Sequence, residues 1–282
     1  MNGPMNFGRL LILVLSVLPR HGMSRVAGWI ANRPVPRTLR GSVYRGYARI
    51  FGARPEDAEL PLEEYASINK FFTRKLRDGL RPIAPDAIVS PADSGVGAFG
   101  VITNDTLVQA KGRNYSLAAL LGDKSFADRF EGGTFATFYL APKDYHRVHS
   151  PVDGEIVSAK YIPGELWPVN VFAVAHVADL FAVNERIVVE IARPNGGVAA
   201  VVFVGATMVG MTRLVFDDMH TNARRREVQE RRYQPPIAVS AGGPLGHFEF
   251  GSTIVMACSK DGGGLEALEV GQTVKMGERV GR

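Results

Sequence analysis

Residues 246–255 read Gly-His-Phe-Glu-Phe-Gly-Ser-Thr-Ile-Val, and this stretch decides how the rest of the chain is interpreted. It places Gly-Ser-Thr directly before an apolar run that is rich in β-branched residues, which predicts the start of a strand. Glycine lets the backbone take strained or left-handed angles next to a reactive group. The hydroxyl of Ser252 can turn onto the carbonyl of Gly251. The pattern therefore places a serine hydroxyl within reach of the preceding backbone carbonyl.

Two upstream segments supply the groups that such a serine needs. Residues 144–151 read Asp-Tyr-His-Arg-Val-His-Ser-Pro and hold two of the six histidines, and residues 90–93 read Ser-Pro-Ala-Asp. An acid, a base and a hydroxyl can activate a serine in any chain order. His146 and His149 could instead be metal ligands, but no Cys cluster or acidic motif lies nearby, so we expect no metal site. We expect His247 to lie in a turn.

At these motifs the sequence resembles the phosphatidylserine decarboxylases, in their bacterial form. These are self-processing enzymes of phospholipid synthesis that depend on a pyruvoyl group. The resemblance runs over nearly the whole chain, and eight segments in order with similar spacing are a specific signal. They are Phe71–Arg74, Pro91–Asp93, Lys111–Leu117, Asp144–His149, Pro163–Gly164, Asn184–Arg186, Val204–Ala206 and Gly251–Thr253.

The resemblance implies a self-cleavage between Gly251 and Ser252. In that scheme His149 takes the proton of the Ser252 hydroxyl, and Asp93 orients His149 and stabilises its charged form. Ser252 attacks the Gly251 carbonyl, the peptide becomes an ester, and elimination breaks the chain. Ser252 then becomes the covalent pyruvoyl cofactor. The two products, a large chain ending at Gly251 and a small chain starting at position 252, are expected to stay together as a heterodimer.

The resemblance also implies the reaction that follows. The pyruvoyl ketone would form a Schiff base with the amine of phosphatidylserine and accept the electrons that carbon dioxide leaves behind. Phosphatidylethanolamine would be the product. The carbanion must be protonated by a positioned acid, and the family uses the first histidine of this motif in the decarboxylation half. His146 is therefore the expected proton donor.

The pattern along the chain predicts a helical region over residues 1–80 and a β-rich body over residues 81–282. Leu62, Tyr65, Ile68, Phe72 and Leu76 recur at near-helical spacing. Ser116 before an apolar run that ends at Gly122 predicts a short capped helix. Strands are predicted at four short β-branched or aromatic runs, which are residues 134–140, 186–191, 198–206 and 252–257.

Ser90-Pro91-Ala92-Asp93 recurs as Ser150-Pro151-Val152-Asp153, each followed by a glycine and a β-type segment. Residues 270–278 have the turn-strand-turn pattern of lipoyl-like sandwiches. We therefore expect an α+β, mostly β fold, with a duplicated hybrid β-sandwich or barrel-like body, which is also the architecture of the resembled family. A non-enzymatic lipoyl-like or phosphotransferase-like carrier is the alternative, although Lys275 is a poor match to a modifiable lysine.

The N-terminal region predicts an anchor at the membrane surface. Residues 10–18 read Leu-Leu-Ile-Leu-Val-Leu-Ser-Val-Leu, far short of a spanning helix. Residues 26–30 are a second apolar patch with Trp29 between arginines, so two amphipathic helices at the interface are expected. The alternative is that these helices pack on their own domain.

The net charge of +5 and a pI near 9.4 suit an anionic surface. Since the sequence contains no nucleic-acid module, we expect membrane lipid as partner and no nucleic acid. The single Cys258, expected in a buried strand position, fits a reducing compartment. Together these features predict a peripheral protein on the cytoplasmic face of the cell membrane.

A cluster of arginines, namely Arg224, Arg225, Arg226, Arg231 and Arg232, lies between residues 217 and 236. One interpretation is a solvated helix face or loop with Glu227 and Glu230 as partners. The other is a basic flap against anionic headgroups.

Overall fold

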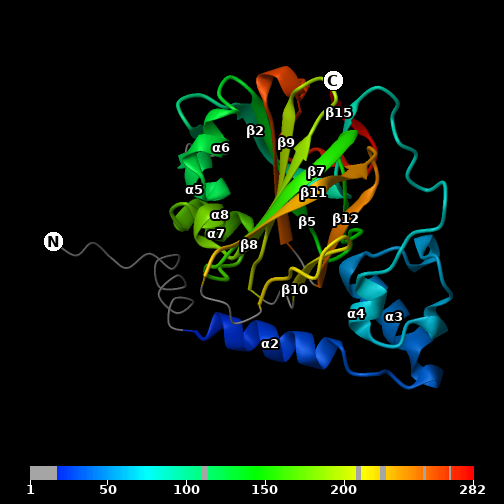
Figure 1. The fold of residues 1–282 in the computed structure, drawn as a ribbon. Coiled ribbons are helices and arrows are strands. Elements are labelled where there is room, and N and C mark those ends of the chain that lie inside the picture. The colour runs from blue at the N-terminus through cyan, green and yellow to red at the C-terminus, as the bar shows by residue number, and fades with distance from the viewer. Residues whose placement is uncertain (1–17, 109–113, 208–210, 223–226, 250–251, 267) are drawn as a thin grey trace.

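An open eight-stranded antiparallel sheet forms the centre of the molecule (Figure 1). The computed structural model describes residues 18–108, 114–207, 211–222, 227–249, 252–266 and 268–282. The spatial order of the strands is β11-β7-β8-β9-β13-β5-β2-β14. They span β2 (Ser94–Val101), β5 (Thr134–Leu140), β7 (Gly154–Ile162), β8 (Arg186–Ala192), β9 (Val198–Val204), β11 (Gln229–Val239), β13 (Ser252–Cys258) and β14 (Thr273–Val274). The four strands predicted from sequence are β5, β8, β9 and β13, so those predictions are confirmed.

Both faces of the central strands β8 and β9 are buried, which explains why these strands read as continuous apolar runs. Successive side chains of a strand point to opposite faces. In β9, Val201 and Phe203 therefore join one core cluster while Ala200 and Val202 join the other. Cys258, at the end of β13, is a fully buried free thiol in a strand, as expected.

Short sheets and helices cover the two faces. One face packs against β6 (Arg147–His149) and β12 (Pro244–Glu249), which pair with β10 (Met211–Leu214) in a three-stranded sheet. Four short helices gather on the other face (Figure 1), namely α5 (Leu117–Leu121), α6 (Lys124–Asp128), α7 (Val171–His176) and α8 (Leu180–Val183). The remaining short elements are β1 (Ile88–Val89) with β15 (Arg279–Gly281), β3 (Thr106–Val108) with β4 (Asn114–Ser116), and the 3₁₀ turn η3 (Lys260–Gly262).

The capped helix predicted after Ser116 is present as α5. The Ser116 hydroxyl accepts a hydrogen bond from the Ala119 N–H at 3.0 Å. Gly122 ends the helix in the left-handed conformation, at φ 65°. Polar capping and a C-terminal glycine were therefore sufficient to locate this element from sequence.

The segment before the sheet is helical but less continuous than its spacing predicts. It consists of α2 (Arg20–Ala31), α3 (Arg37–Phe51), α4 (Ile68–Phe72) and the 3₁₀ turns η1 (Pro55–Asp57) and η2 (Leu62–Glu64). The near-helical spacing from Leu62 to Leu76 therefore does not belong to one continuous helix. Ser67 caps α4 by accepting from the Lys70 N–H at 3.2 Å, so the chain restarts there instead of continuing from η2.

Both Ser-Pro-x-Asp turns make the same hydrogen bonds. The hydroxyls of Ser90 and Ser150 donate to the carbonyls of Ala92 and Val152, at 2.8 and 2.7 Å. The carboxylates of Asp93 and Asp153 accept from the Met276 and Ala241 N–H groups, at 3.0 and 2.9 Å. Each turn also bonds to a left-handed glycine, Gly277 in the first case and Gly242 in the second. The repeated sequence motif therefore forms the same turn structure twice.

The order of strands in the large sheet is also symmetric about its middle. Each half of the sheet has four strands. When the strands of one half are numbered in chain order, they lie from the centre outward as third, second, first and fourth. They are β13, β5, β2 and β14 in one half and β9, β8, β7 and β11 in the other. Register shifts interrupt β2 between Val96 and Ala98 and β7 between Ile156 and Ser158. In the described residues β11 and β14 are open edges, so the barrel-like expectation is corrected to an open, covered sheet.

Part of the arginine-rich segment is a strand, β11, and not the expected helix or loop. Arg231 lies 2.6 Å from Asp217 and 2.5 Å from Asp218, and Arg232 lies 2.9 Å from Glu230. Arg224, Arg225 and Arg226 lie outside the described residues.

The apolar run at residues 10–18, predicted as part of the membrane anchor, falls almost entirely outside the described residues. Among the helices that the structure describes, none combines the length and apolar character needed to cross a bilayer.

Candidate active site

Ser252 is the first residue of β13, the strand that lies between β5 and β9 at the middle of the sheet. Its backbone pairs with Leu140 of β5, and from Thr253 onward β13 also pairs with β9. Gly251 lies outside the described residues. The backbone on the C-terminal side of the predicted cut is thus held by a central strand.

His146 lies next to the end of this pairing. Its Nε2 donates to the carbonyl of Ala141 at 3.0 Å, and Ala141 directly follows Leu140. Its own carbonyl accepts from the Phe248 N–H at 3.0 Å. The ring is fully buried and stacks on Phe72 of α4, with ring centres 3.9 Å apart. Burial lowers the pKa of His146 to about 3, so the ring is neutral at pH 7.

The Nδ1 atom of His146 has no hydrogen-bond partner among the described residues, although it is buried. Because Nε2 carries the proton that is donated to Ala141, Nδ1 presents a free lone pair. A buried polar atom without a partner costs free energy, and such atoms are common where chemistry takes place.

His149 lies at the far end of β6, opposite Pro244 of β12. Its Nδ1 donates to the carbonyl of Gly242 at 2.7 Å, and the Tyr145 hydroxyl lies 3.1 Å from its Nε2. Burial lowers the pKa of His149, and Arg147 adds to this effect, whereas the Gly242 carbonyl and the charge of Asp93 oppose it. Both ring nitrogens are therefore engaged.

Asp93 is buried and binds cations. Its carboxylate accepts from Arg81 Nε at 2.8 Å and Arg81 Nη2 at 2.5 Å, and the Lys275 ammonium lies 3.5 Å away. Burial alone would raise the pKa of Asp93, but the hydrogen bonds from Arg81 and the Met276 N–H, together with these cations, lower it. Asp93 is thus ionised, as a stabiliser of a charged histidine must be.

The structure gathers Asp93, His146 and His149 but does not join Asp93 to His149 by a hydrogen bond. The partner of His149 Nδ1 is the Gly242 carbonyl, and Asp93 acts on both histidines only through its charge. The side chain of Ser252 lies outside what the structure describes.

Sequence reasoning missed four neighbours of these groups: Arg81, Phe72, Tyr145 and Gly242. Phe72 and Tyr145 lie inside segments that carried the resemblance, so the sequence could have placed them near the site, although it could not show their contacts. Nothing in the sequence joined Arg81 to Asp93. His247, expected in a turn, belongs to β12 instead, and burial lowers its pKa to about 4.

A cavity of about 480 Å³ borders His149 and Tyr145. Its other lining side chains include four cations and two acids, Lys75, Arg77, Arg81 and Arg147 with Glu59 and Asp78. Arg147 bonds through Nε to the Thr73 carbonyl at 3.0 Å and makes no ion pair among the described residues. The space beside His149 is therefore wide enough for a small group and carries positive charge.

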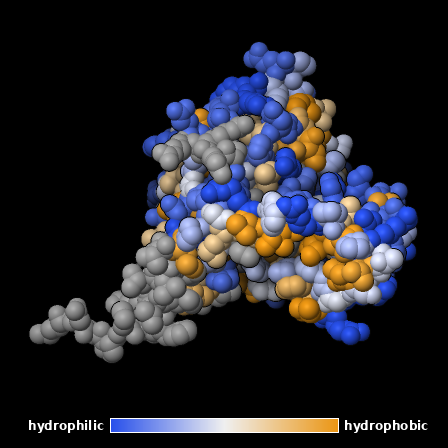
Figure 2. Space-filling model, turned by 90° about the horizontal axis from the view of Figure 1, so that it is seen from below, coloured by the Kyte–Doolittle hydropathy of each residue, from blue (hydrophilic) through white to orange (hydrophobic). Residues whose placement is uncertain are grey.

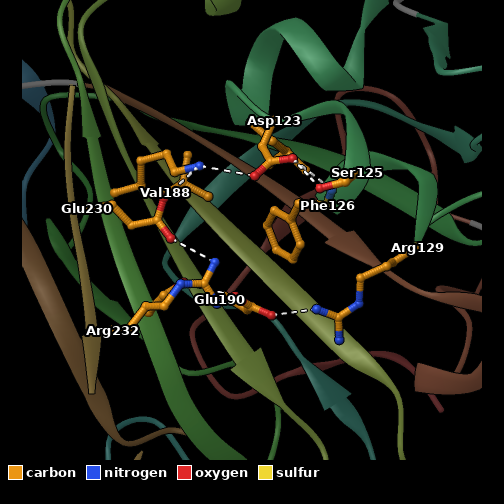
Figure 3. Close-up of a pocket in the computed structure, with 11 residues that line it drawn as sticks. Asp123, Ser125, Phe126, Arg129, Val188, Glu190, Glu230 and Arg232 are labelled. Atoms are coloured by element: carbon orange, nitrogen blue, oxygen red, sulfur yellow. Dashed lines mark hydrogen bonds and ion pairs between the residues drawn. The ribbon is translucent and has the colours of Figure 1, made fainter. Parts of the chain in front are cut away.

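A smaller charged cavity, of about 120 Å³, lies elsewhere, between α6 and β11 (Figure 3). Lys160 pairs there with Asp123 at 3.4 Å and with Glu230 at 3.0 Å. Arg129 pairs with Glu190 at 2.7 Å on its other side. These groups neutralise one another, and none of the predicted site residues lines this cavity. Among the described side chains, no group of three or more His, Cys, Asp or Glu could hold a metal ion.

Comparison with known proteins agrees with the motifs. The family model described as phosphatidylserine decarboxylase matches residues 68–282. The chain belongs to the phosphatidylserine decarboxylase family. It is 42% identical to the phosphatidylserine decarboxylase proenzyme of Anaeromyxobacter sp. (strain K), over 97% of this chain and 98% of that protein. The proenzyme of Myxococcus xanthus (strain DK1622) is 38% identical over 95% and 96% of the two chains. That of Nitrosospira multiformis is 40% identical over 94% and 93%.

Proposed function

We propose that this protein decarboxylates phosphatidylserine to phosphatidylethanolamine, after cutting itself between Gly251 and Ser252. The observation that carries this proposal is the position of Ser252 at the start of a central strand, where it pairs with Leu140, the residue before the carbonyl that His146 binds. Membership of a family whose curated relatives are named proenzymes adds to it. The carrier alternative has no comparable support, because Lys275 lies beside Asp93.

In the first stage, His149 accepts the proton of the Ser252 hydroxyl and Asp93 stabilises the resulting imidazolium through its charge. In this arrangement the Gly242 carbonyl holds the Nδ1–H of His149, and Asp93 acts on the ring through its charge.

In the second stage, the residues present fit a pyruvoyl group derived from Ser252. The strand β13 would hold it, and the free Nδ1 of His146 is a buried atom that still needs a partner. That group supplies a carbonyl that withdraws electrons from the bond that breaks. His146 holds the proton that is returned to the substrate carbon. Burial lowers the pKa of His146 in the uncut chain, and its free Nδ1 is the atom on which the ring would receive the proton that it returns.

Intact-mass measurement of the purified protein tests the proposal. We expect a large fragment that ends at Gly251 and a small one that begins with a ketone at position 252. Ser252→Ala should leave one uncut chain of 30.6 kDa without decarboxylase activity. An active, cut Ser252→Ala protein would contradict the proposal.

We further propose that α2 and α3 bind the cytoplasmic face of the membrane, where the anionic substrate lies. Three large apolar side chains at i, i+3 and i+4 spacing are exposed on α2, Val26 (58%), Trp29 (61%) and Ile30 (56%). On α3, Leu39 and Ile50 are also exposed, at 53% and 77%. Figure 2 views the side on which α2 lies, and orange side chains interrupt the blue surface there. Such stripes with arginines around them suit a lipid interface.

Two finer structural proposals accompany this function. The matched turns and the symmetric strand order support a duplicated hybrid β-sandwich as the origin of the body, residues 81–282, with residues 1–80 as a helical membrane-associating region. The two cleavage products would remain a heterodimer, because the small chain would include β13, β14 and β15, each paired with a strand of the large chain.

A further inference from the structure

Tyr145 occupies the acceptor nitrogen of the histidine that the proposed self-cleavage needs as a base. Its hydroxyl lies 3.1 Å from His149 Nε2, and the two rings lie 5.6 Å apart at 31°. Both residues are buried, with 5% and 8% of their surfaces exposed. This contact therefore has little competition from water.

The two hydrogen bonds of His149 together fix its protonation. A backbone carbonyl can only accept, so Nδ1 must carry the proton that it donates to Gly242. A neutral imidazole then has its lone pair on Nε2, and the Tyr145 hydroxyl must be the donor in the second contact. The ring is held as the tautomer in which Nε2 is a base.

Gly242 is itself held in place by the second Ser-Pro-x-Asp turn. Its N–H donates to the Ser150 carbonyl at 2.8 Å, and its φ is 77°. The carbonyl that receives His149 thus has a fixed direction, and Tyr145 approaches from the opposite nitrogen.

We propose that Tyr145 is a positioning residue of the self-cleavage reaction, which sets the tautomer and the basicity of His149 by donating its hydroxyl proton to Nε2. This inference rests on the proposed role of His149. It concerns the uncut chain and requires no group that cleavage creates.

Donation to Nε2 stabilises the neutral ring, because a charged imidazolium has no lone pair to receive it. Removing the hydroxyl should therefore raise the pKa of His149. The charged groups around this ring are Asp93, Arg81 and Arg147, and the cavity adds Lys75, Arg77, Glu59 and Asp78. All of them remain in a Tyr145→Phe variant, so a shift in pH dependence would report the hydroxyl alone.

The test is the pH profile of self-cleavage, measured as the rate at which uncut chain disappears on a gel. In Tyr145→Phe the midpoint of the acid limb should move upward by roughly half a pH unit or more. Tyr44→Phe is the matched control, since it also removes a buried hydroxyl, which donates to the Tyr65 carbonyl at 2.6 Å. That control should leave the midpoint unchanged. An unchanged or lowered midpoint in Tyr145→Phe would overturn the inference.

Nitrogen NMR of the histidines in the Ser252→Ala protein gives a second measurement that needs no cleavage. We expect a protonated Nδ1 and a bare Nε2 for His149 at neutral pH, and a higher pKa when Tyr145→Phe is added. A protonated Nε2 would overturn the inference even if Tyr145→Phe fails to fold. Normal cleavage by His149→Ala would instead contradict the proposed function, and the NMR result would still decide what Tyr145 does to the ring.

Discussion

Burial lowers the pKa of three histidines near the proposed site, His146, His149 and His247. In the unfolded chain each would bind a proton below about pH 6.5. The folded protein binds fewer protons than the unfolded chain in that range, so its free energy of unfolding falls as the pH is lowered. This contribution to the free energy of unfolding is complete above pH 6.5 and is lost as the pH falls toward the folded pKa values, about 4 for His247 and about 3 for His146.

His247→Gln tests this relation at a position outside the proposed machinery. Between pH 7 and pH 5 the partly buried His247 should account for about 1–2 kcal/mol of lost stability, given its pKa of about 4. The Gln variant should therefore lose less stability over this interval, as measured by denaturant unfolding of the uncut Ser252→Ala protein. His176→Gln, at an exposed position, should keep the original dependence. Equal slopes for the two variants would contradict the argument.

The two motif histidines should differ in which stage they serve. His149→Ala should stop cleavage, because the Ser252 hydroxyl loses its base. His146→Ala should permit at least partial cleavage and abolish decarboxylation. Gel analysis and carbon dioxide release measure the two stages separately. Exchanged phenotypes, or normal cleavage in both variants, would show that the roles are assigned wrongly.

The residue types of this site could be predicted from sequence, but its contacts could not. Asp93, His146 and His149 could be singled out from sequence because their motifs are local in the chain and the resemblance is specific. Their partners Arg81 and Gly242 come from other segments, and only the folded chain brings them near. Asp93 is consequently held by Arg81, where a direct bond to His149 was expected.

At the scale of elements, predictions were best where a local signal sufficed. Strand β5 and helix α5 were located by β-branched residues, a serine cap and a glycine stop. The near-helical spacing from Leu62 to Leu76 did not locate the helix ends, because apolar spacing does not reveal that Ser67 starts a new helix. The strand β11 was not predicted, because its many charged residues suggested a solvated helix face or loop. Edge strands also carry such charges.

The glycine turn behind His149 gives a prediction at this scale. Gly242→Ala forces a left-handed φ on alanine and places its Cβ 2.4 Å from Ile83 Cδ1. Gly196→Ala is the matched control, with a φ of 85° and no atom within 4 Å. Gly196→Ala should lose about 1–2 kcal/mol of unfolding free energy through its backbone alone, and Gly242→Ala should lose more because Ile83 must also shift. Only Gly242→Ala should also slow self-cleavage, because its carbonyl holds His149. Equal cleavage rates in the two variants would argue against that coupling.

At the scale of the whole molecule, the exposed apolar side chains of α2 form one side of the proposed membrane contact. Replacing Val26, Trp29 and Ile30 with Ser should weaken sedimentation with anionic vesicles while leaving cleavage intact. Replacing Val101, Val228 and Val270, which are as exposed on the β-rich body, is the matched control. High salt should weaken binding without abolishing it. Salt screens the electrostatic attraction of each arginine to anionic lipid, roughly 1 kcal/mol, but does not screen the contribution of apolar burial. Unchanged binding in the α2 variant would place the contact elsewhere.

The position of β13 between β5 and β9 has a consequence for the life of the cut protein. A strand at the middle of a sheet cannot leave by peeling from an edge, so release of the small chain would require the sheet to split along two ladders at once. The small chains should therefore not exchange between molecules, and dilution should not inactivate the enzyme. Each molecule would keep for its lifetime the one reactive group that it made from its own backbone.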